Sequence, residues 1–299
     1  MASALPCGAR NPTCADHLLA HSRLPRAEAR LLLERASGQR REWLLAHGER
    51  PLGTSVCEHF LSLNARREKG EPIAYLLGER EFHGHTFHVD ARVLIPRPET
   101  ELLVDEAIAR APKGARIIDL GTGSGAIAIS LALARPDLMI VASDASHDAL
   151  ALAQHNAERL QVPRKRLQWR QGDWWEAAAS GERFALVIAN PPYIAESDPH
   201  LLAGDLRFEP RAALASGPDG LGALSIIIAG SAPRLAPGGW ILLEHGWNQA
   251  ASVRHLLGAR GLVDVASLHD LAGHERVSLA RAPACAPRAP LPSTGGRMV

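Results

Sequence analysis

The stretch Arg116-Ile-Ile-Asp-Leu-Gly-Thr-Gly-Ser-Gly-Ala-Ile-Ala-Ile129 decides the fold of this 299-residue chain. Its apolar start predicts a buried strand that ends in the carboxylate of Asp119, and its apolar end predicts a helix. Between them, Gly121, Gly123 and Gly125 form a turn in which the backbone can approach a ligand closely. A strand, a glycine turn and a helix in this order predict an α/β domain that binds a nucleotide-like ligand.

The next strand supports such a ligand. Residues 138–143 are mostly apolar and are followed by Asp144, whose carboxylate is placed to accept hydrogen bonds from a ribose diol. The pattern Gly121-x-Gly123-x-x-Ala126 also satisfies the loose fingerprint of NAD-binding proteins. The glycines by themselves therefore leave NAD and S-adenosylmethionine open.

A polar motif follows a later strand. Residues 184–189 have the length and composition of a buried parallel strand, and Asn190-Pro-Pro-Tyr193 comes directly after them. In open α/β sheets, ligands bind at the carboxyl ends of strands. The Asn190 side-chain oxygen and the Pro191 carbonyl are hydrogen-bond acceptors, Tyr193 offers an aromatic face, and neither proline has an N–H. The motif suits a planar amino group with two N–H bonds.

Methyl transfer to such a group has specific requirements. The nitrogen lone pair of an amide or aromatic amine is delocalised, so methylation requires the nitrogen to become pyramidal. Two acceptors would favour that geometry, and their hydrogen bonds would strengthen as positive charge grows on nitrogen. No strong base is required, because the proton becomes acidic only after the methyl group arrives. Asn and Pro are also ordinary turn residues, so a plain strand-to-loop turn stays open.

Two further features favour a methyl donor over NAD. Asp119 resembles the acidic start of the loop in class I methyltransferases, and Gly172-Asp-Trp174, after an expected third strand, could flank an adenine. Trp174 and Trp175 could equally be packing aromatics. An oxidoreductase would explain the glycine turn but not the motif at Asn190.

The N-terminal part of the chain has helical periodicity. Three apolar groups, at 29–33, 43–45 and 60–63, predict three helices in a small all-helical domain over residues 16–72. This domain contains no group of residues typical of a reaction centre, so we expect it to bind or orient a partner. Residues 73–92, with Gly84 at a turn, predict a linker hairpin.

The rest of the chain completes the domain organisation. We expect a methyltransferase domain over residues 93–283, a flexible arm over 1–15 and a disordered tail over 284–299. Within the domain, residues 94–101 lead into a helix, and Arg97 and Glu101 could simply stabilise its start electrostatically. A fifth strand after the turn at 238–239 ends at Glu244, and residues 262–268 and 276–280 complete the sheet.

Composition restricts the class of protein. The formal net charge is +1 and aromatic residues make up 4%, so there is no global electrostatic footprint for nucleic acid. Neither the 4 cysteines nor the 14 histidines have metal-ligand spacing, and we expect no metal. We see no secretory leader and no apolar run of membrane-spanning length, which predicts a cytoplasmic protein with no membrane partner.

Taken together, the motifs resemble those of the bacterial peptide chain release factor glutamine methyltransferases, the protein-(glutamine-N5) methyltransferase family. The resemblance covers roughly residues 16–282. The Asn-Pro-Pro-Tyr signature is shared with adenine and cytosine amino methyltransferases, so specificity for this family depends on the segment at 96–101 and on the helical domain. The matching stretches are Arg66-Arg67, Gly70-Glu-Pro-Ile-Ala-Tyr75, Leu94-Ile-Pro-Arg-Pro-Glu-Thr-Glu101, Asp119-Leu-Gly-Thr-Gly-Ser-Gly125, Asn190-Pro-Pro-Tyr193, Phe208-Glu-Pro210 and Glu244-His-Gly246.

The resemblance implies a fold, a reaction and a set of site residues. The fold would be a seven-stranded, Rossmann-like class I methyltransferase domain preceded by a small helical domain. The reaction would move a methyl group from S-adenosylmethionine, leaving S-adenosylhomocysteine, to the glutamine of the Gly-Gly-Gln loop in class I release factors and so modulate translation termination. The implied donor-binding residues are Asp119, Gly121, Thr122, Gly123, Ser124, Gly125, Asp144, Trp174 and Asn190. Asn190, Pro191 and Tyr193 would be catalytic, and Asn190, Pro191, Pro192, Tyr193, Arg97 and Glu101 would contact the substrate.

Some alternatives stay open at this point. Phe208 stands where the resemblance leads us to expect a tyrosine, so this position lacks the hydroxyl that a polar role would need. Ribosomal-protein glutamine methyltransferases resemble the catalytic part but should differ at residues 96–101. A nucleic-acid amino methyltransferase would need a basic face, and we expect no stable nucleic-acid partner. A non-catalytic adaptor that binds a release factor or the ribosome is disfavoured by the intact glycine turn, Asp144 and the motif at Asn190.

Overall fold

The structure is a computed structural model that describes residues 13–284. Most of the expected N-terminal arm and nearly all of the expected C-terminal tail therefore lie outside the described residues. The first described residues are anchored: Cys14 bridges Pro51, and the Leu52 N–H donates to the Thr13 carbonyl at 3.0 Å. The expected flexible arm over residues 1–15 therefore extends too far, because residues 13–15 are structured and Ala15 is buried at the start of a helix.

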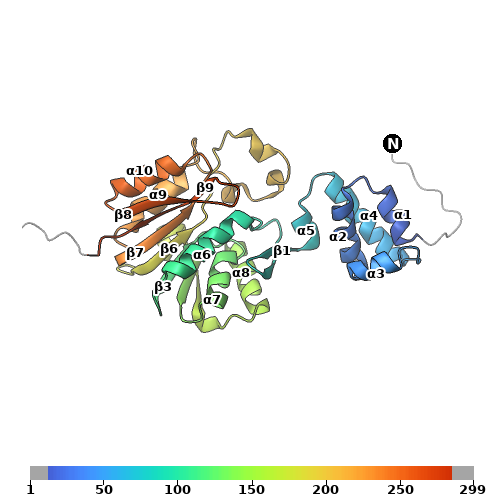
Figure 1. Ribbon diagram of the computed structural model, residues 1–299, viewed down its shortest axis with the longest axis horizontal. Helices are drawn as coiled ribbons and strands as arrows, with labels where there is room; N and C mark the ends of the chain where they lie inside the picture. Colours follow the sequence, from blue (N-terminus) through green and yellow to red (C-terminus); the bar gives the residue numbers. More distant parts are fainter. Residues whose placement is uncertain (1–12, 285–299) are drawn as a thin grey trace, which may run out of the picture.

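Residues 13–77 form a helical domain, which stands apart from the rest of the molecule in Figure 1. Its residues pack around one apolar core that includes Leu32, Leu33 and Phe60. Five helices make up this part of the described chain, two more than the sequence predicts. They are α1 (Ala15–His21), α2 (Arg26–Ser37), α3 (Arg41–Ala46), α4 (Thr54–Glu68) and α5 (Ile73–Leu77).

The apolar groups that predict these helices are only partly buried. Leu31, Leu45 and Leu61 are exposed, whereas their neighbours Leu33 and Leu44 are buried. Each residue turns by about 100° around a helix, so a continuous apolar run cannot face one core throughout. Helix α5 also occupies the start of the segment that the sequence predicts as a linker hairpin.

The hairpin itself follows α5 and belongs to the core of the α/β domain. Strands β1 (Glu79–Phe82) and β2 (His85–His88) pair antiparallel, and Gly84 lies in the turn at φ +74°. The Phe82 and Phe87 rings are buried and meet edge to face at 6.1 Å between centroids. Both rings belong to the apolar core that includes Leu103 and Ile117, which holds the hairpin against the sheet domain.

The α/β domain contains a seven-stranded sheet in the order β5-β4-β3-β6-β7-β9-β8, which confirms the predicted class I methyltransferase fold. Only β9 runs antiparallel to its neighbours β7 and β8. The strands are β3 (Arg116–Leu120), β4 (Met139–Asp144), β5 (Leu167–Gln171), β6 (Phe184–Ala189), β7 (Leu235–Glu244), β8 (Val263–His269) and β9 (Glu275–Arg281).

Helices cover both faces of this sheet (Figure 1). Because side chains alternate along a strand, Ile117 packs into one apolar core and Ile118 into the other. The first core is covered by α6 (Glu101–Arg110), α7 (Ala126–Ala134) and α8 (His147–Arg159), and the second by η3 (Trp174–Ala177), α9 (Gly222–Ser231) and α10 (Ala250–Ala259).

The strand order reverses between β3 and β6, which creates a crevice at their carboxyl ends. Register places Leu120 beside both Ser143 and Ala189, and Ala189 beside Leu243. The glycine turn, Asp144, Asn190 and Glu244 therefore emerge at the same edge of the sheet. No helix among residues 13–284 is long and apolar enough to cross a membrane.

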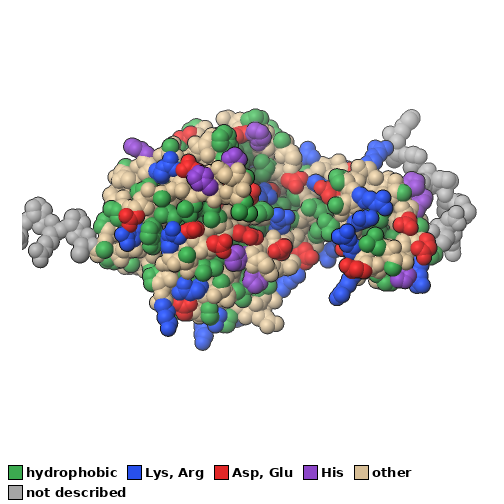
Figure 2. Space-filling view, in the orientation of Figure 1, with side chains coloured by type: hydrophobic (Ala, Val, Ile, Leu, Met, Phe, Trp, Pro, Cys, Tyr) green, Lys and Arg blue, Asp and Glu red, His purple; other side chains and the backbone are tan. Residues whose placement is uncertain are grey.

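The helical and α/β domains touch through arginines. Arg67 of α4 binds both carboxylate oxygens of Glu28, at 2.8 and 3.0 Å, and also Asp205 of the long connection between β6 and α9 at 3.0 Å. From that connection, Arg207 donates to the Lys69 carbonyl. Figure 2 shows acidic and basic side chains interspersed over the visible face of the α/β domain.

Candidate active site

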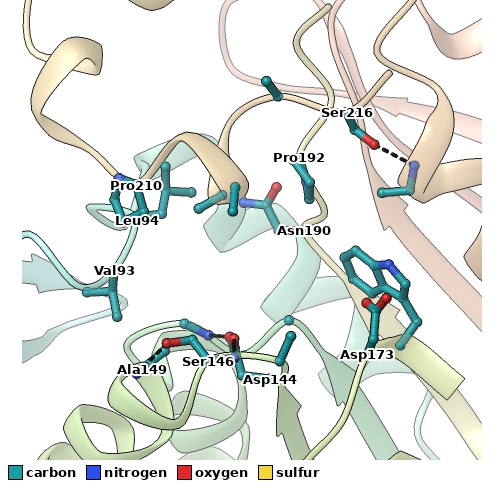
Figure 3. A pocket seen from close by; sticks show the side chains of 18 of the residues that line it. Val93, Leu94, Asp144, Ser146, Ala149, Asp173, Asn190, Pro192, Pro210 and Ser216 are labelled. Atoms are coloured by element: carbon teal, nitrogen blue, oxygen red, sulfur yellow. Dashed lines mark hydrogen bonds between the residues drawn. The ribbon is translucent and has the colours of Figure 1, made fainter. Parts of the chain in front are cut away.

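A cavity of about 520 Å³ opens at the crevice between the ends of β3, β4 and β6 (Figure 3). Its floor comes from the turns after these strands. Its other walls come from residues 92–94 before α6 and residues 210–216 before α9. Six residues that the sequence predicts as site residues line it: Gly121, Gly123, Asp144, Trp174, Asn190 and Pro192.

Asp144 presents its carboxylate to the cavity at the end of β4 (Figure 3). One oxygen accepts a hydrogen bond from the Gly123 N–H at 2.9 Å and the other from the Ser146 N–H at 2.9 Å. Each oxygen keeps a further lone pair for a ligand hydroxyl. Burial raises the pKa of Asp144 above its ordinary value, and these backbone hydrogen bonds oppose the rise.

Gly123 leaves its side of the cavity open. Its φ is +55°, and no atom lies within 4 Å of the position that a Cβ would occupy. A bound molecule could thus approach the backbone of the turn closely.

Asp119 lies beneath the turn and does not line the cavity. It is fully buried, and its Oδ2 accepts a hydrogen bond from the Thr122 hydroxyl at 2.7 Å. Burial raises the pKa of Asp119 to about 7, and the charge of Asp144 adds to the rise. Its Oδ1 has no hydrogen-bond partner within the described part of the chain. Asp119 and Thr122 therefore shape the turn from below.

Ser124 and Gly125 also support the turn from outside the cavity. The Ser124 carbonyl accepts a hydrogen bond at 2.9 Å from Asn156 of α8, which also pairs with both backbone groups of His88 in the hairpin. A Cβ at Gly125, where φ is +81°, would lie 3.1 Å from the Ala153 Cβ. The glycine permits close packing of α7 on α8. Asn156 was not predicted, because nothing in its local sequence marks it.

The two tryptophans after β5 have different roles. Trp174 lines the cavity with a backbone φ of +44°, a left-handed conformation that costs about 1–2 kcal/mol for a non-glycine residue. Its ring packs on the turn, since a Cβ at Gly121 would lie 3.3 Å from it. Trp175 is buried and donates from its indole nitrogen to the Ile227 carbonyl at 3.0 Å. Only Trp174 is therefore available to a ligand.

The motif at Asn190 is divided between the cavity and the layer behind it. Asn190 and Pro192 line the cavity, whereas Pro191 is buried. The Tyr193 hydroxyl turns away from the cavity and donates to Glu244 Oε1 at 3.3 Å. Burial and the charge of Glu244 raise the pKa of Tyr193.

A hydrogen-bond chain holds the Asn190 side chain from behind. Asn190 Nδ2 donates to Thr100 Oγ1 at 3.0 Å, and the Thr100 hydroxyl donates to Glu244 Oε2 at 2.7 Å. Among residues 13–284, no donor pairs with Asn190 Oδ1 or with the Pro191 carbonyl. The end of β6 therefore carries two unpaired acceptors, and one of them belongs to Asn190, which lines the cavity. The sequence predicted neither contact, although Glu244 is visible as an acidic residue at a strand end.

Comparison with known proteins identifies a family for both domains. Residues 13–78 match the family model of the PrmC N-terminal domain, and residues 98–229 match that of the methyltransferase small domain. A release factor glutamine methyltransferase from Bordetella pertussis is 50% identical over 268 residues, which are 89% of this chain and 98% of that protein.

This chain belongs to the release factor glutamine methyltransferase family. The resemblance inferred from the motifs is thereby confirmed. The release factor glutamine methyltransferase of Escherichia coli is 46% identical over 261 residues, covering 87% of this chain and 93% of that protein. A methyltransferase from Pyrococcus furiosus, with a TM-score of 0.52 and 15% identity over 74% of this chain and 98% of that one, shares the fold.

In this member of the release factor glutamine methyltransferase family, Arg97 and Glu101 lie outside the cavity. Arg97 forms an ion pair with the buried carboxylate of Glu209, which also accepts from the Ile95 N–H at 3.0 Å. Glu101 accepts from the His83 N–H at 2.9 Å and ties α6 to the hairpin. Both side chains thus connect separate segments of the α/β domain. Neither lines the cavity, so its geometry does not support the expectation that Arg97 and Glu101 contact the substrate.

Arg97 and Glu209 connect the two segments that wall the cavity. Arg97 follows residues 92–94, and Glu209 precedes residues 210–216. Phe208, the departure noted in the sequence, lies under the Arg207 guanidinium at 5.0 Å and does not line the cavity. Within residues 13–284, no group of three or more His, Cys, Asp or Glu side chains is arranged to hold a metal ion.

Proposed function

We propose that this protein transfers a methyl group from S-adenosylmethionine to the N5 side-chain amide nitrogen of a glutamine in peptide chain release factors. The observation that carries the proposal is the placement of Asp144 and Asn190 on one cavity. A carboxylate suited to a ribose and an acceptor suited to an amide thus face the same space. The family to which the chain belongs supports the choice of substrate.

The donor would be held by the turns after β3, β4 and β5. Asp144 would accept hydrogen bonds from the ribose hydroxyls, the Trp174 ring would contact the adenine, and the open backbone at Gly121 and Gly123 would admit the rest of the molecule. When bound, S-adenosylmethionine supplies a methyl group on a positively charged sulfur. Asp119 would act indirectly, because it supports the turn through Thr122.

The acceptor amide would be held at the end of β6. Asn190 Oδ1 and the Pro191 carbonyl would each accept one of its two N–H bonds, since both oxygens are free of protein donors within residues 13–284. These hydrogen bonds would strengthen as positive charge grows on the amide nitrogen, so they would favour the transition state over the bound substrate. Pro192 would limit the space around the amide.

The glutamine would be that of the Gly-Gly-Gln loop of class I release factors, and its modification would modulate translation termination in the cytoplasm. The helical domain, which Arg67 and Arg207 join to the α/β domain, would orient the release factor. The choice of the Gly-Gly-Gln loop depends on the family resemblance. The orienting role of the helical domain depends on its sequence, which contains no group of residues typical of a reaction centre.

The test is methyl transfer from labelled S-adenosylmethionine to purified release factor, beside a copy whose loop glutamine is changed to alanine. Peptide mass spectrometry would locate the label. Label on the unaltered loop only would support both reaction and substrate. A protein that binds the donor but labels neither copy would contradict the substrate assignment, and ribosomal proteins and nucleic acid would be tested next.

A further inference from the structure

The hydrogen-bond chain behind Asn190 has a defined direction. While Glu244 is ionised it can only accept hydrogen bonds, so the Thr100 hydroxyl then donates its single proton to Glu244 Oε2, 2.7 Å away. The Thr100 oxygen can then only accept from Asn190, and the partner at 3.0 Å is Nδ2. The amide oxygen of Asn190 is consequently the atom that is not bound to Thr100, and within residues 13–284 no donor pairs with it.

Within residues 13–284, the Thr100 hydroxyl takes part in no hydrogen bond other than these two. Thr100 is buried at the N-cap position of α6, where a hydroxyl commonly accepts from the backbone of the first helical turn. Here that side-chain hydrogen bond is absent. The hydroxyl instead reaches across to Glu244, 144 residues away in the chain.

Glu244 is the buried end of this hydrogen-bond chain and is linked to the Asn-Pro-Pro-Tyr motif at two places. One carboxylate oxygen is linked to Asn190 through the Thr100 hydroxyl, and the other accepts directly from the Tyr193 hydroxyl at 3.3 Å. A buried carboxylate without partners would be costly, so both hydrogen bonds are needed to keep it in place.

We propose that Thr100 and Glu244 are positioning residues that fix the Asn190 side chain with its oxygen, and not its NH2 group, toward the acceptor substrate. The proposal rests on the proposed methylation of an amide. If the Asn190 side-chain amide were rotated by 180°, Oδ1 and Nδ2 would exchange places. The NH2 group of Asn190 would then face the NH2 group of the substrate, and two donors cannot hydrogen bond to each other. The same orientation would favour a glutamine side chain over a glutamate, whose carboxylate has no N–H to donate.

The central variant is Thr100→Val, which keeps the shape of the side chain and removes the hydroxyl. Asn190 Nδ2 would then face a methyl group and would turn toward the cavity to find water. To keep Oδ1 toward the substrate, Asn190 would have to leave Nδ2 without a partner, which costs the free energy of a buried unpaired donor. We therefore expect turnover to fall about tenfold to a hundredfold. The affinity for S-adenosylhomocysteine, measured by calorimetry, should change by less than about twofold.

Two further variants serve as controls. Thr100→Ser restores the hydroxyl and should recover turnover to within about threefold of the original protein. Ser231→Ala removes a buried hydroxyl that donates to the Ile228 carbonyl at 2.8 Å, away from the cavity lining. It should lower the melting temperature while leaving turnover unchanged, which separates a general loss of packing from a loss of orientation.

A measurement that needs no activity separates this proposal from the proposed function. Solvent exchange of the Asn190 side-chain amide protons, followed by NMR, should be slow for one proton in the original protein and in Thr100→Ser, and fast for both in Thr100→Val. Equal exchange in all three proteins, or turnover of Thr100→Val within twofold of the original, would overturn the positioning role. Slow exchange in a protein that methylates no release factor would instead contradict the proposed function.

Discussion

Replacement of Asn190 by alanine is the most direct probe of the proposed reaction. The substitution removes Oδ1, one of the two acceptors that we propose for the substrate amide. In the transition state this hydrogen bond would be charge-assisted, and loss of one such preorganised contact typically costs about 2.7–4 kcal/mol, or 10²–10³ in turnover. We expect Asn190→Ala to lose turnover by that factor.

The structure also limits the side effects of this substitution. Asn190 Nδ2 makes a single protein hydrogen bond, at 3.0 Å to Thr100, and the Thr100 hydroxyl keeps its bond to Glu244 when Asn190 is gone. No buried donor loses its partner, so the free energy of unfolding should fall by only about 0.5–1.5 kcal/mol. The loss of turnover should therefore occur in a folded protein.

The assay is single-turnover methyl transfer to release factor, with donor affinity measured separately by calorimetry. Donor affinity should stay within about threefold, because Asp144, whose carboxylate we propose binds the ribose, and the turn at Gly123 are unchanged. Turnover near that of the original protein would remove Asn190 from the mechanism. A loss of donor affinity as large as the loss of turnover would show that Asn190 serves the donor and not the acceptor.

Three other perturbations test different parts of the site. Asp144→Ala should weaken S-adenosylhomocysteine binding at least about tenfold, because a charged hydrogen bond contributes about 1.5–3 kcal/mol; unchanged calorimetric affinity would contradict the ribose assignment. Gly125→Ala should lower the free energy of unfolding in urea by roughly 2–4 kcal/mol, since a Cβ at φ +81° would crowd Ala153 at 3.1 Å. Burial raises the pKa of Glu244 to about 7, and the charge of Glu99 adds to the rise. The hydrogen bonds from Thr100 and Tyr193 and the charge of Arg276 act in the opposite direction. The folded protein therefore binds more protons than the unfolded chain between about pH 4.5 and 7, so stability should fall as pH rises through this window and level off above it. Glu244→Gln should reduce this slope relative to the original protein in thermal melts from pH 5 to 8, and an identical slope would show that Glu244 does not titrate there.

The close agreement between the predicted and observed catalytic domain has a local cause. The strand, glycine turn and helix at 116–129, and the strand that precedes Asn190, are continuous in the sequence, so periodicity and turn chemistry identify them directly. In a parallel sheet the carboxyl ends of strands share one edge, so the sequence also indicates that these motifs approach one another.

The helical domain was harder to predict in detail. An apolar run such as 31–33 indicates a helix, but only the neighbouring helices decide that Leu31 faces solvent while Leu33 is buried. Short helices such as α5 have too few residues to show a period, and the turn chemistry around them resembles that of a linker.

What the sequence alone determined is the α/β fold, the family and the two motifs that face the cavity, because each is encoded by residues that are neighbours in the chain. What only the tertiary structure decided is the layer behind them. Thr100 meets Asn190 across 90 residues and Arg97 meets Glu209 across 112. Such pairs leave no periodic or local signal, since each partner is placed by a different element, and only the packed sheet brings them within hydrogen-bond distance.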